Sequence, residues 1–106
     1  MARAPFQVHG FPFRKSAAGI YEYAIFRRPD DGYWQAIAGG GEDTESPVEA
    51  AKRETVEEAG IPSSADLFML GTTASVPTFH FKARHLWPKG LYVIPAYYFA
   101  VRASGV

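Results

Sequence analysis

A helix with clear start and stop signals follows a run of glycines, and this segment constrains the fold more than any other part of the chain. Ser46 is a favourable N-cap residue, Pro47 suits the first helical position, and Glu49 completes a capping box with Ser46. Gly60 is the left-handed residue expected directly after a helix. The sequence therefore predicts a helix over Pro47–Ala59.

The predicted helix carries several glutamates on one face. Glu54, Glu57 and Glu58 are spaced i, i+3 and i+4, which places them within a sector of about 100°. Ala50 shares this sector, and we expect its small side chain to leave room for a ligand. Arg53 lies on the flank, where its guanidinium can orient a carboxylate. We expect a neighbouring stripe to pack on a sheet, and its residues are Val48, Ala51, Thr55 and Ala59.

Two interpretations of the glutamates are open. Glutamate is a good helix former and charged runs usually face solvent, so the face could simply be hydrated. Alternatively, the carboxylates bind Mg²⁺ or Mn²⁺, which prefer oxygen ligands. Glu57 and Glu58 lie toward the C-terminal end of the helix, where the helix dipole disfavours anions, and this favours the second interpretation. A zinc site is poorly supported, because the chain has no Cys and only 3 scattered His residues.

The same segment resembles the Nudix box, G-x5-E-x7-R-E-U-x-E-E-x-G-U, in which U is a bulky aliphatic residue. The matching fixed positions are Gly39, Glu45, Arg53, Glu54, Glu57, Glu58 and Gly60. Ile61 satisfies the last U position, whereas Thr55 occupies the first one and adds a hydroxyl group. The resemblance covers residues 6–62 and is weaker in the rest of the chain.

The resemblance implies a hydrolase that acts on a nucleoside diphosphate linked to another group. It implies that Glu54, Glu57 and Glu58 ligate the metal and that Arg53 holds one of these carboxylates in place. As the catalytic base we favour Glu57, with Glu54 as the alternative. The loop at residues 39–45 would shape the metal and phosphate site. Its glycines can approach a ligand closely and adopt positive φ, and they are Gly39, Gly40 and Gly41.

Charge is unevenly distributed along the chain. The formal net charge is zero, so neither a nucleic acid nor a membrane held by bulk charge is indicated. Seven of the 11 acidic residues lie between Glu42 and Glu58, whereas the second half is mainly basic. We expect Arg28, Lys82 and Arg84 to bind substrate phosphates, although they could also be solubilising surface residues. Nearby aromatic residues either stack on a base or pterin ring or pack in the core, and they are Phe79, Phe81 and Trp87.

The order of elements predicts an α/β fold. We expect strands near residues 6–14, 20–28, 33–38, 67–76, 78–82 and 91–102. The resemblance implies an α/β/α sandwich on a mixed sheet, formed by one domain over residues 1–106 that lacks the final strand and C-terminal helix. An uncovered sheet face or edge would then favour a homodimer. The chain has no apolar window long enough to span a bilayer, and its lack of Cys fits a cytoplasmic protein.

The substrate is expected to be a small nucleotide or pterin polyphosphate. The resemblance favours a (d)NTP or dihydroneopterin triphosphate that is cleaved to release pyrophosphate. The alternative is a catalytically silent Nudix-like module that binds a nucleotide or a protein partner. The intact set of Arg53, Glu54, Glu57 and Glu58 favours the enzyme.

Overall fold

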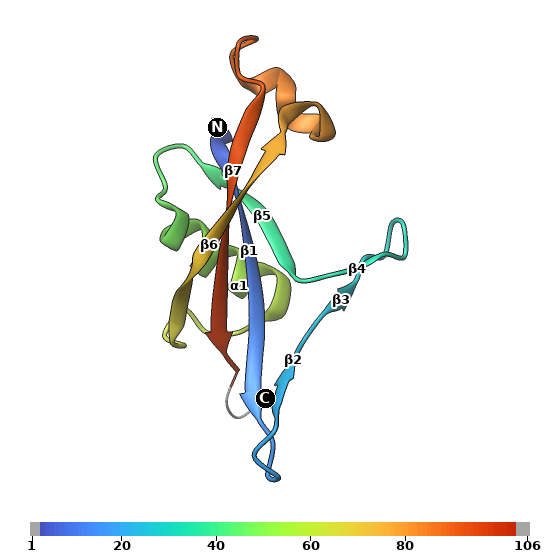
Figure 1. The fold of residues 1–106 in the computed structure, drawn as a ribbon, viewed down its shortest axis with the longest axis vertical. Helices are drawn as coiled ribbons and strands as arrows, with labels where there is room; N and C mark the ends of the chain where they lie inside the picture. The colour runs from blue at the N-terminus through green and yellow to red at the C-terminus, as the bar shows by residue number, and fades with distance from the viewer. Residues whose placement is uncertain (1–2, 104–106) are drawn as a thin grey trace.

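The chain forms a mixed β-sheet with a helix packed across it (Figure 1). The structure is a computed structural model, and it describes residues 3–103. In chain order the elements are β1 (Arg3–Lys15), β2 (Tyr21–Tyr23), β3 (Phe26–Arg27), β4 (Trp34–Gln35), β5 (Ile37–Glu42), α1 (Pro47–Ala59), β6 (Leu67–Pro77), the 3-10 helices η1 (Thr78–His80) and η2 (Lys82–Leu86), and β7 (Val93–Arg102). The predicted α/β fold class with a mixed sheet is confirmed.

Strand β1 is the centre of the main sheet. It pairs in antiparallel orientation with β5 along its first half and with β2 at its end, and it is parallel to β7. Strand β6 pairs with the other side of β7 in antiparallel orientation. Strands β3 and β4 form a separate two-stranded ribbon that projects away from the main sheet (Figure 1). Within residues 3–103, β5 pairs only with β1, so it forms an edge of the sheet.

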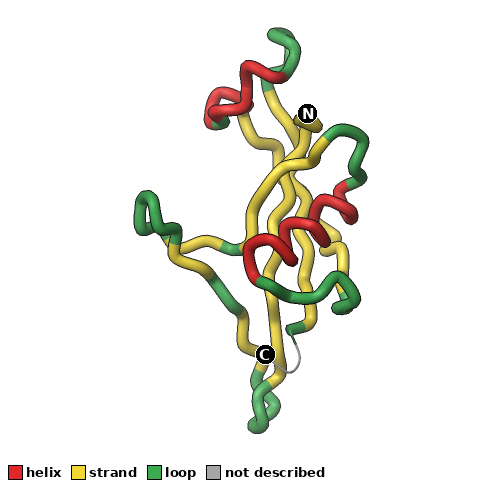
Figure 2. Tube along the Cα trace, turned by 180° about the vertical axis from the view of Figure 1, so that it is seen from behind, coloured by secondary structure: helices red, strands yellow, loops and turns green. Residues whose placement is uncertain are grey.

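Helix α1 lies across one face of the sheet (Figure 2). The buried cluster beneath it joins small helix residues to alternate residues of the strands, and its members are Ala4, Phe6, Val8, Ala50, Ala51 and Phe99. Within residues 3–103, the sheet face opposite α1 carries no α-helix. In the same part of the chain, no helix is both long and apolar enough to cross a membrane.

The ends of α1 match the sequence prediction. The Ser46 hydroxyl accepts a hydrogen bond from the Glu49 N–H at 3.2 Å, and the Glu49 carboxylate accepts one from the Ser46 N–H at 2.8 Å. Gly60 has a φ of 66° and its N–H donates to the Val56 carbonyl at 3.0 Å. Both ends of the helix are therefore fixed by local contacts.

The packed face of α1 differs from the predicted stripe. Val48 is 37% exposed, whereas Ala50 is fully buried in the core and leaves no room for a ligand. Thr55 is buried as predicted, and its hydroxyl donates to the Ala51 carbonyl at 2.7 Å. Thr55 occupies a motif position that is usually aliphatic, and its hydroxyl group therefore has a hydrogen-bond partner within the helix.

Three strand predictions were wrong in part. The predicted strand at residues 33–38 is divided between β4, which pairs with β3, and β5, which pairs with β1. Residues 78–82, predicted as a strand, form η1 and the start of η2, and the Thr78 hydroxyl donates to the Leu91 carbonyl at 2.8 Å. The predicted strand at residues 20–28 is divided between β2 and β3. Its first part pairs with β1 and its second part pairs with β4, so the chain changes partner between them.

Candidate active site

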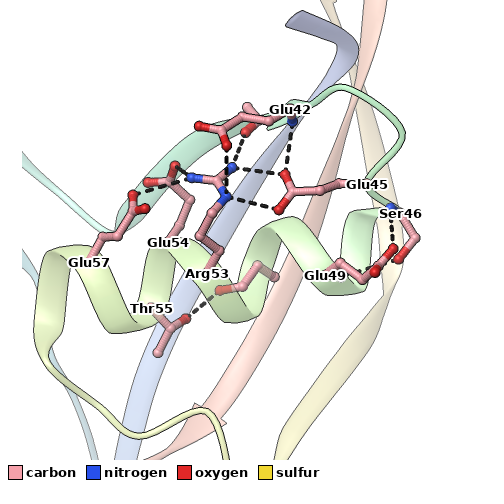
Figure 3. Close-up of polar contacts among 10 residues, drawn as sticks. Glu42, Glu45, Ser46, Glu49, Arg53, Glu54, Thr55 and Glu57 are labelled. Atoms are coloured by element: carbon pink, nitrogen blue, oxygen red, sulfur yellow. Dashed lines mark hydrogen bonds and ion pairs between the residues drawn. The ribbon is translucent and has the colours of Figure 1, made fainter. Parts of the chain in front are cut away.

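Arg53 lies at the centre of a cluster of carboxylates (Figure 3). Its Nε and Nη2 donate to the two carboxylate oxygens of Glu45 at 2.9 and 3.0 Å. Nη1 donates to Glu54 at 2.7 Å and to Glu57 at 3.2 Å. The hydrogen bond to Glu45 is the main cause that raises the pKa of Arg53. The guanidinium therefore contacts several carboxylates at once, in line with the predicted orienting role of Arg53.

Arg53 also fixes the segment that leads into the helix. Its Nη2 donates to the Gly40 carbonyl at 2.8 Å, which ties α1 to strand β5. Glu45 accepts a further hydrogen bond from the Glu42 N–H at 2.8 Å, which closes the turn after β5. The hydrogen bond from Arg53 holds the pKa of Glu45 below its usual range. Glu45 is thus an ionised residue that positions Arg53.

The glycine run forms part of strand β5, so the predicted loop with positive φ is wrong. A Cβ atom on Gly39 would lie 2.6 Å from both carboxylate oxygens of Glu54, and one on Gly41 would overlap the Phe6 ring. A Cβ atom on Gly40 would overlap the Arg3 guanidinium. At each of these positions a side chain from another element occupies the space where a Cβ would lie, and it would have to shift if the glycine were replaced.

Glu58 lies next to Glu54 at the other end of the cluster. Burial is the main cause that raises the pKa of Glu58 to about 8, followed by a hydrogen bond with Glu54 and by the charges of Glu54 and Glu57. The Ala38 N–H donates to Glu58 at 3.4 Å and acts in the opposite direction. The crowding of these carboxylates therefore disfavours the ionised form of Glu58.

The donor set fits a hard divalent cation. Within residues 3–103 no three acidic or His side chains are already arranged as a ligand set, and Arg53 contacts two of the candidate ligands, Glu54 and Glu57. The candidate donors are all carboxylates, the ligands that Mg²⁺ and Mn²⁺ prefer. A cation among them would relieve the repulsion between their charges. Metal ligation by these residues stays a prediction.

A cavity of about 530 Å³ opens beside Glu58. Its lining includes Phe26, Arg28, Gln35 and Ala38, so the predicted substrate residue Arg28 lies next to the cluster. Arg28 also donates to both carboxylate oxygens of Asp30 at 3.1 and 2.9 Å. The Arg28 side chain therefore faces the cavity with its charge partly neutralised.

The other predicted substrate residues lie elsewhere. Lys82 and Arg84 are exposed on η2, and within residues 3–103 neither forms a side-chain hydrogen bond or ion pair with the glutamates. Trp87 is only 7% exposed and its indole N–H donates to the Arg3 carbonyl at 2.9 Å. Phe81 packs edge-on against Trp87, with ring centroids 5.6 Å apart. Of the two alternatives for the aromatic residues, Trp87 follows packing in the core, whereas Phe79 is 64% exposed.

Sequence reasoning missed Arg3, which lies against Gly40 beside the cluster. No capping, spacing or motif signal marks this residue. The only hint is the glycine run itself, since each glycine leaves space for a side chain that the sequence does not identify.

Comparisons with known proteins show which family and which structures this chain resembles. The model of the NUDIX domain family matches residues 20–105. A solved structure from Listeria monocytogenes, assigned as a NUDIX hydrolase, is 40% identical with a TM-score of 0.81. That match covers 93% of this chain and 64% of the Listeria chain, so this chain spans less than two thirds of that protein. A search of curated proteins finds no match.

Two more distant structures share the fold. The Escherichia coli dihydroneopterin triphosphate pyrophosphohydrolase is 22% identical with a TM-score of 0.72, and the match covers 95% of this chain and 69% of that one. A Caenorhabditis elegans Ap4A hydrolase is 20% identical with a TM-score of 0.63, and the match covers 96% and 68% of the two chains. At these identities the likeness shows the fold alone.

Proposed function

The chain belongs to the Nudix family, and from this premise we propose that it is a divalent-metal-dependent hydrolase of phosphoanhydride bonds. Its substrate would be a nucleoside diphosphate linked to another group. The observation that carries the proposal is the cluster around Arg53, in which one guanidinium nitrogen contacts both Glu54 and Glu57 while Glu58 lies beside them. Phosphoryl transfer depends mainly on positioning and charge stabilisation. In this cluster the hydrogen bonds from Arg53 hold charged carboxylates in fixed positions close to one another.

Glu54, Glu57 and Glu58 would hold Mg²⁺ or Mn²⁺. When bound, such a cation supplies charge neutralisation on the phosphate oxygens. The carboxylate of Glu54 is only 13% exposed and is confined between Arg53 and Gly39, so it suits a fixed ligand. The Arg53 guanidinium would keep this carboxylate oriented before a substrate arrives.

Glu57 is the better candidate for the general base. Its side chain is 56% exposed and its contact with Arg53, at 3.2 Å, is longer than that of Glu54 at 2.7 Å. A base must accept a proton from water in the open part of the site, which a confined carboxylate cannot reach as readily. Glu54 remains the alternative base, as the sequence suggested.

The cavity beside Glu58 supports a nucleotide or pterin polyphosphate as substrate. It adjoins the carboxylates and presents the Phe26 ring together with the cations of Arg27 and Arg28. An aromatic surface suits a base or pterin ring, and arginine suits phosphate. A (d)NTP or dihydroneopterin triphosphate, cleaved to release pyrophosphate, fits this combination. The name of the E. coli structure is in line with the second substrate.

A panel of nucleotides tests the proposal. The chain is incubated with (d)NTPs, dihydroneopterin triphosphate and dinucleotide polyphosphates in Mg²⁺ or Mn²⁺, and phosphate and pyrophosphate are measured separately. We expect cation-dependent pyrophosphate release that a chelator abolishes. Nucleotide binding without any turnover would instead identify a catalytically silent module.

A matched pair of variants tests the residue roles. Glu57→Gln should lower turnover by roughly two orders of magnitude or more, the scale of a lost general base. Glu49→Gln is the control, because Glu49 lies on the same helix but contacts Ser46 rather than Arg53. Equal activity in the two variants would contradict the role of Glu57.

A further inference from the structure

Arg3, at the start of β1, lies across strand β5 from the glutamates. Gly39 and Gly41 face α1, since Glu54 and the core residue Phe6 occupy the space beside them. Gly40 faces the opposite side, as expected from the alternation of a strand, and the Arg3 guanidinium occupies its space. Glutamate carboxylates and a guanidinium thus lie against neighbouring residues of one edge strand, on opposite sides of it.

The Arg3 side chain is held in place by neutral groups. Its Nη2 donates to the Gln7 side-chain oxygen at 3.0 Å. Its guanidinium lies over the Trp87 ring, 5.5 Å from the centroid, and the Trp87 indole N–H donates to the Arg3 carbonyl. Cation–π contact and one amide hydrogen bond fix the orientation of the planar group but do not neutralise its charge.

Arg3 is half-buried, and within residues 3–103 no carboxylate lies within ion-pair distance of it. All of the ion pairs of the nearby glutamates go to Arg53 instead. Burial lowers the pKa of Arg3, while the charge of Glu54 raises it and that of Arg53 lowers it. A partly desolvated cation that lacks a counter-ion is costly, and an anion bound beside it would offset this cost.

Strand β5 is thin at this point. It is an edge strand, and residues 39–41 have no side chains that would separate its two sides. A flexible chain of phosphates that lies along this edge could contact groups on both sides at once. The guanidinium fork can donate two hydrogen bonds to one phosphate group.

We propose that Arg3 is a substrate-binding residue that takes phosphate oxygens of the polyphosphate chain at the β5 edge, next to the phosphates held at the glutamates. This role rests on the proposed function and extends it. A side chain at position 40 would displace the guanidinium from this place. The competing explanation is purely structural, namely that Arg3 joins the start of β1 to the segment that contains Trp87.

Binding of inorganic tripolyphosphate in Mg²⁺, measured by calorimetry, tests the proposal without depending on turnover. Arg3→Gln should weaken binding by about 10- to 100-fold, the scale of charge-assisted hydrogen bonds to a phosphate group. Arg14→Gln is the matched control, because Arg14 lies at the other end of the same strand, where it pairs with Glu22 at 3.0 Å. It should bind tripolyphosphate as the native chain does.

Two further variants separate binding from packing. Arg3→Lys keeps the charge but loses both the guanidinium fork and the planar contact with Trp87, so it should recover part of the tripolyphosphate affinity while its melting temperature stays as low as that of Arg3→Gln. Gly40→Ala should reproduce the loss of affinity, and adding Arg3→Gln to it should cause no further loss.

The outcomes separate failure of the Arg3 role from failure of the proposed function. Native affinity in Arg3→Gln, or equal loss of affinity in the Lys and Gln variants, would overturn the role of Arg3 and leave the proposed function intact. If the native chain failed to bind tripolyphosphate and also failed to hydrolyse any nucleotide of the panel, the proposed function itself would be overturned.

Discussion

Substitution of Gly39 by Ala tests whether the missing side chain at position 39 allows the Glu54 carboxylate to take its observed position. The added Cβ would lie 2.6 Å from both carboxylate oxygens, so Glu54 must swing away. Glu54 then loses the 2.7 Å hydrogen bond from Arg53. This bond is partly shielded from water, because the Arg53 side chain is 21% exposed and the Glu54 side chain is 13% exposed. Such a bond contributes about 1.5–3 kcal/mol, whereas replacing Gly by Ala within a strand recovers about 0.5–1 kcal/mol.

The net effect on the metal-free protein is a loss of about 1–2 kcal/mol, or roughly 5–10 °C in melting temperature for a domain of this size. Displacement of a candidate ligand should also weaken Mg²⁺ binding by about tenfold or more. Both effects are measurable, the first by thermal unfolding in a chelator and the second by calorimetry with a non-hydrolysable nucleotide present.

Gly71→Ala provides the matched control, because a Cβ on Gly71 would meet nothing within 4 Å and its φ is not positive. This variant should be as stable as the native chain or slightly more stable, with unchanged Mg²⁺ binding. If Gly39→Ala behaved in the same way as Gly71→Ala in both assays, the reasoning about the position of Glu54 would be refuted.

Three other perturbations have definite expected outcomes. The pKa of Glu58 is raised from 4.5 to about 8 in the fold, so the stabilisation present below pH 4.5 is lost as pH rises through about 8; melting temperatures measured in a chelator should fall over this range, and Glu58→Gln should flatten the decline. Thr55→Val removes a hydroxyl that, within residues 3–103, bonds only the Ala51 carbonyl, so unfolding in urea should show a change within about 1 kcal/mol; a larger loss would give the hydroxyl another role. Ser46→Ala removes the N-cap hydrogen bond and should cost about 1 kcal/mol in the same assay, and an unchanged midpoint would mean that the cap contributes nothing.

The helix could be predicted to the residue because its signals are local. Ser46 and Glu49 contact each other, and Gly60 contacts Val56, so every partner lies within one turn. The strands were less certain because pairing partners are distant in sequence. Nothing within residues 20–28 shows that the chain leaves β1 and pairs with β4 halfway along.

The content of the candidate site was predictable, but its arrangement was not. Spacing alone placed Glu54, Glu57 and Glu58 on one side of the helix. It could not show that Arg53 contacts Glu45, eight residues earlier, as well as the helix glutamates. Which carboxylates contact Arg53 depends on which side chains can reach it. For Glu45, this depends on the conformation of the loop between β5 and α1.

The glycine run shows why the missing part could not be recovered from local rules. Consecutive glycines usually indicate a loop, because glycine disfavours regular structure through its conformational entropy. Here the backbone is a regular strand, and side chains from other elements occupy the space beside each glycine: Glu54 from α1, Arg3 and Phe6 from β1. Each contact joins residues more than ten positions apart. The local preference of glycine for a loop is therefore outweighed by three tertiary contacts, which form in the space left by the missing side chains. Two of these contacts bring charged groups to opposite sides of β5. The Arg3 and Gly39 experiments therefore test the two sides of this strand separately.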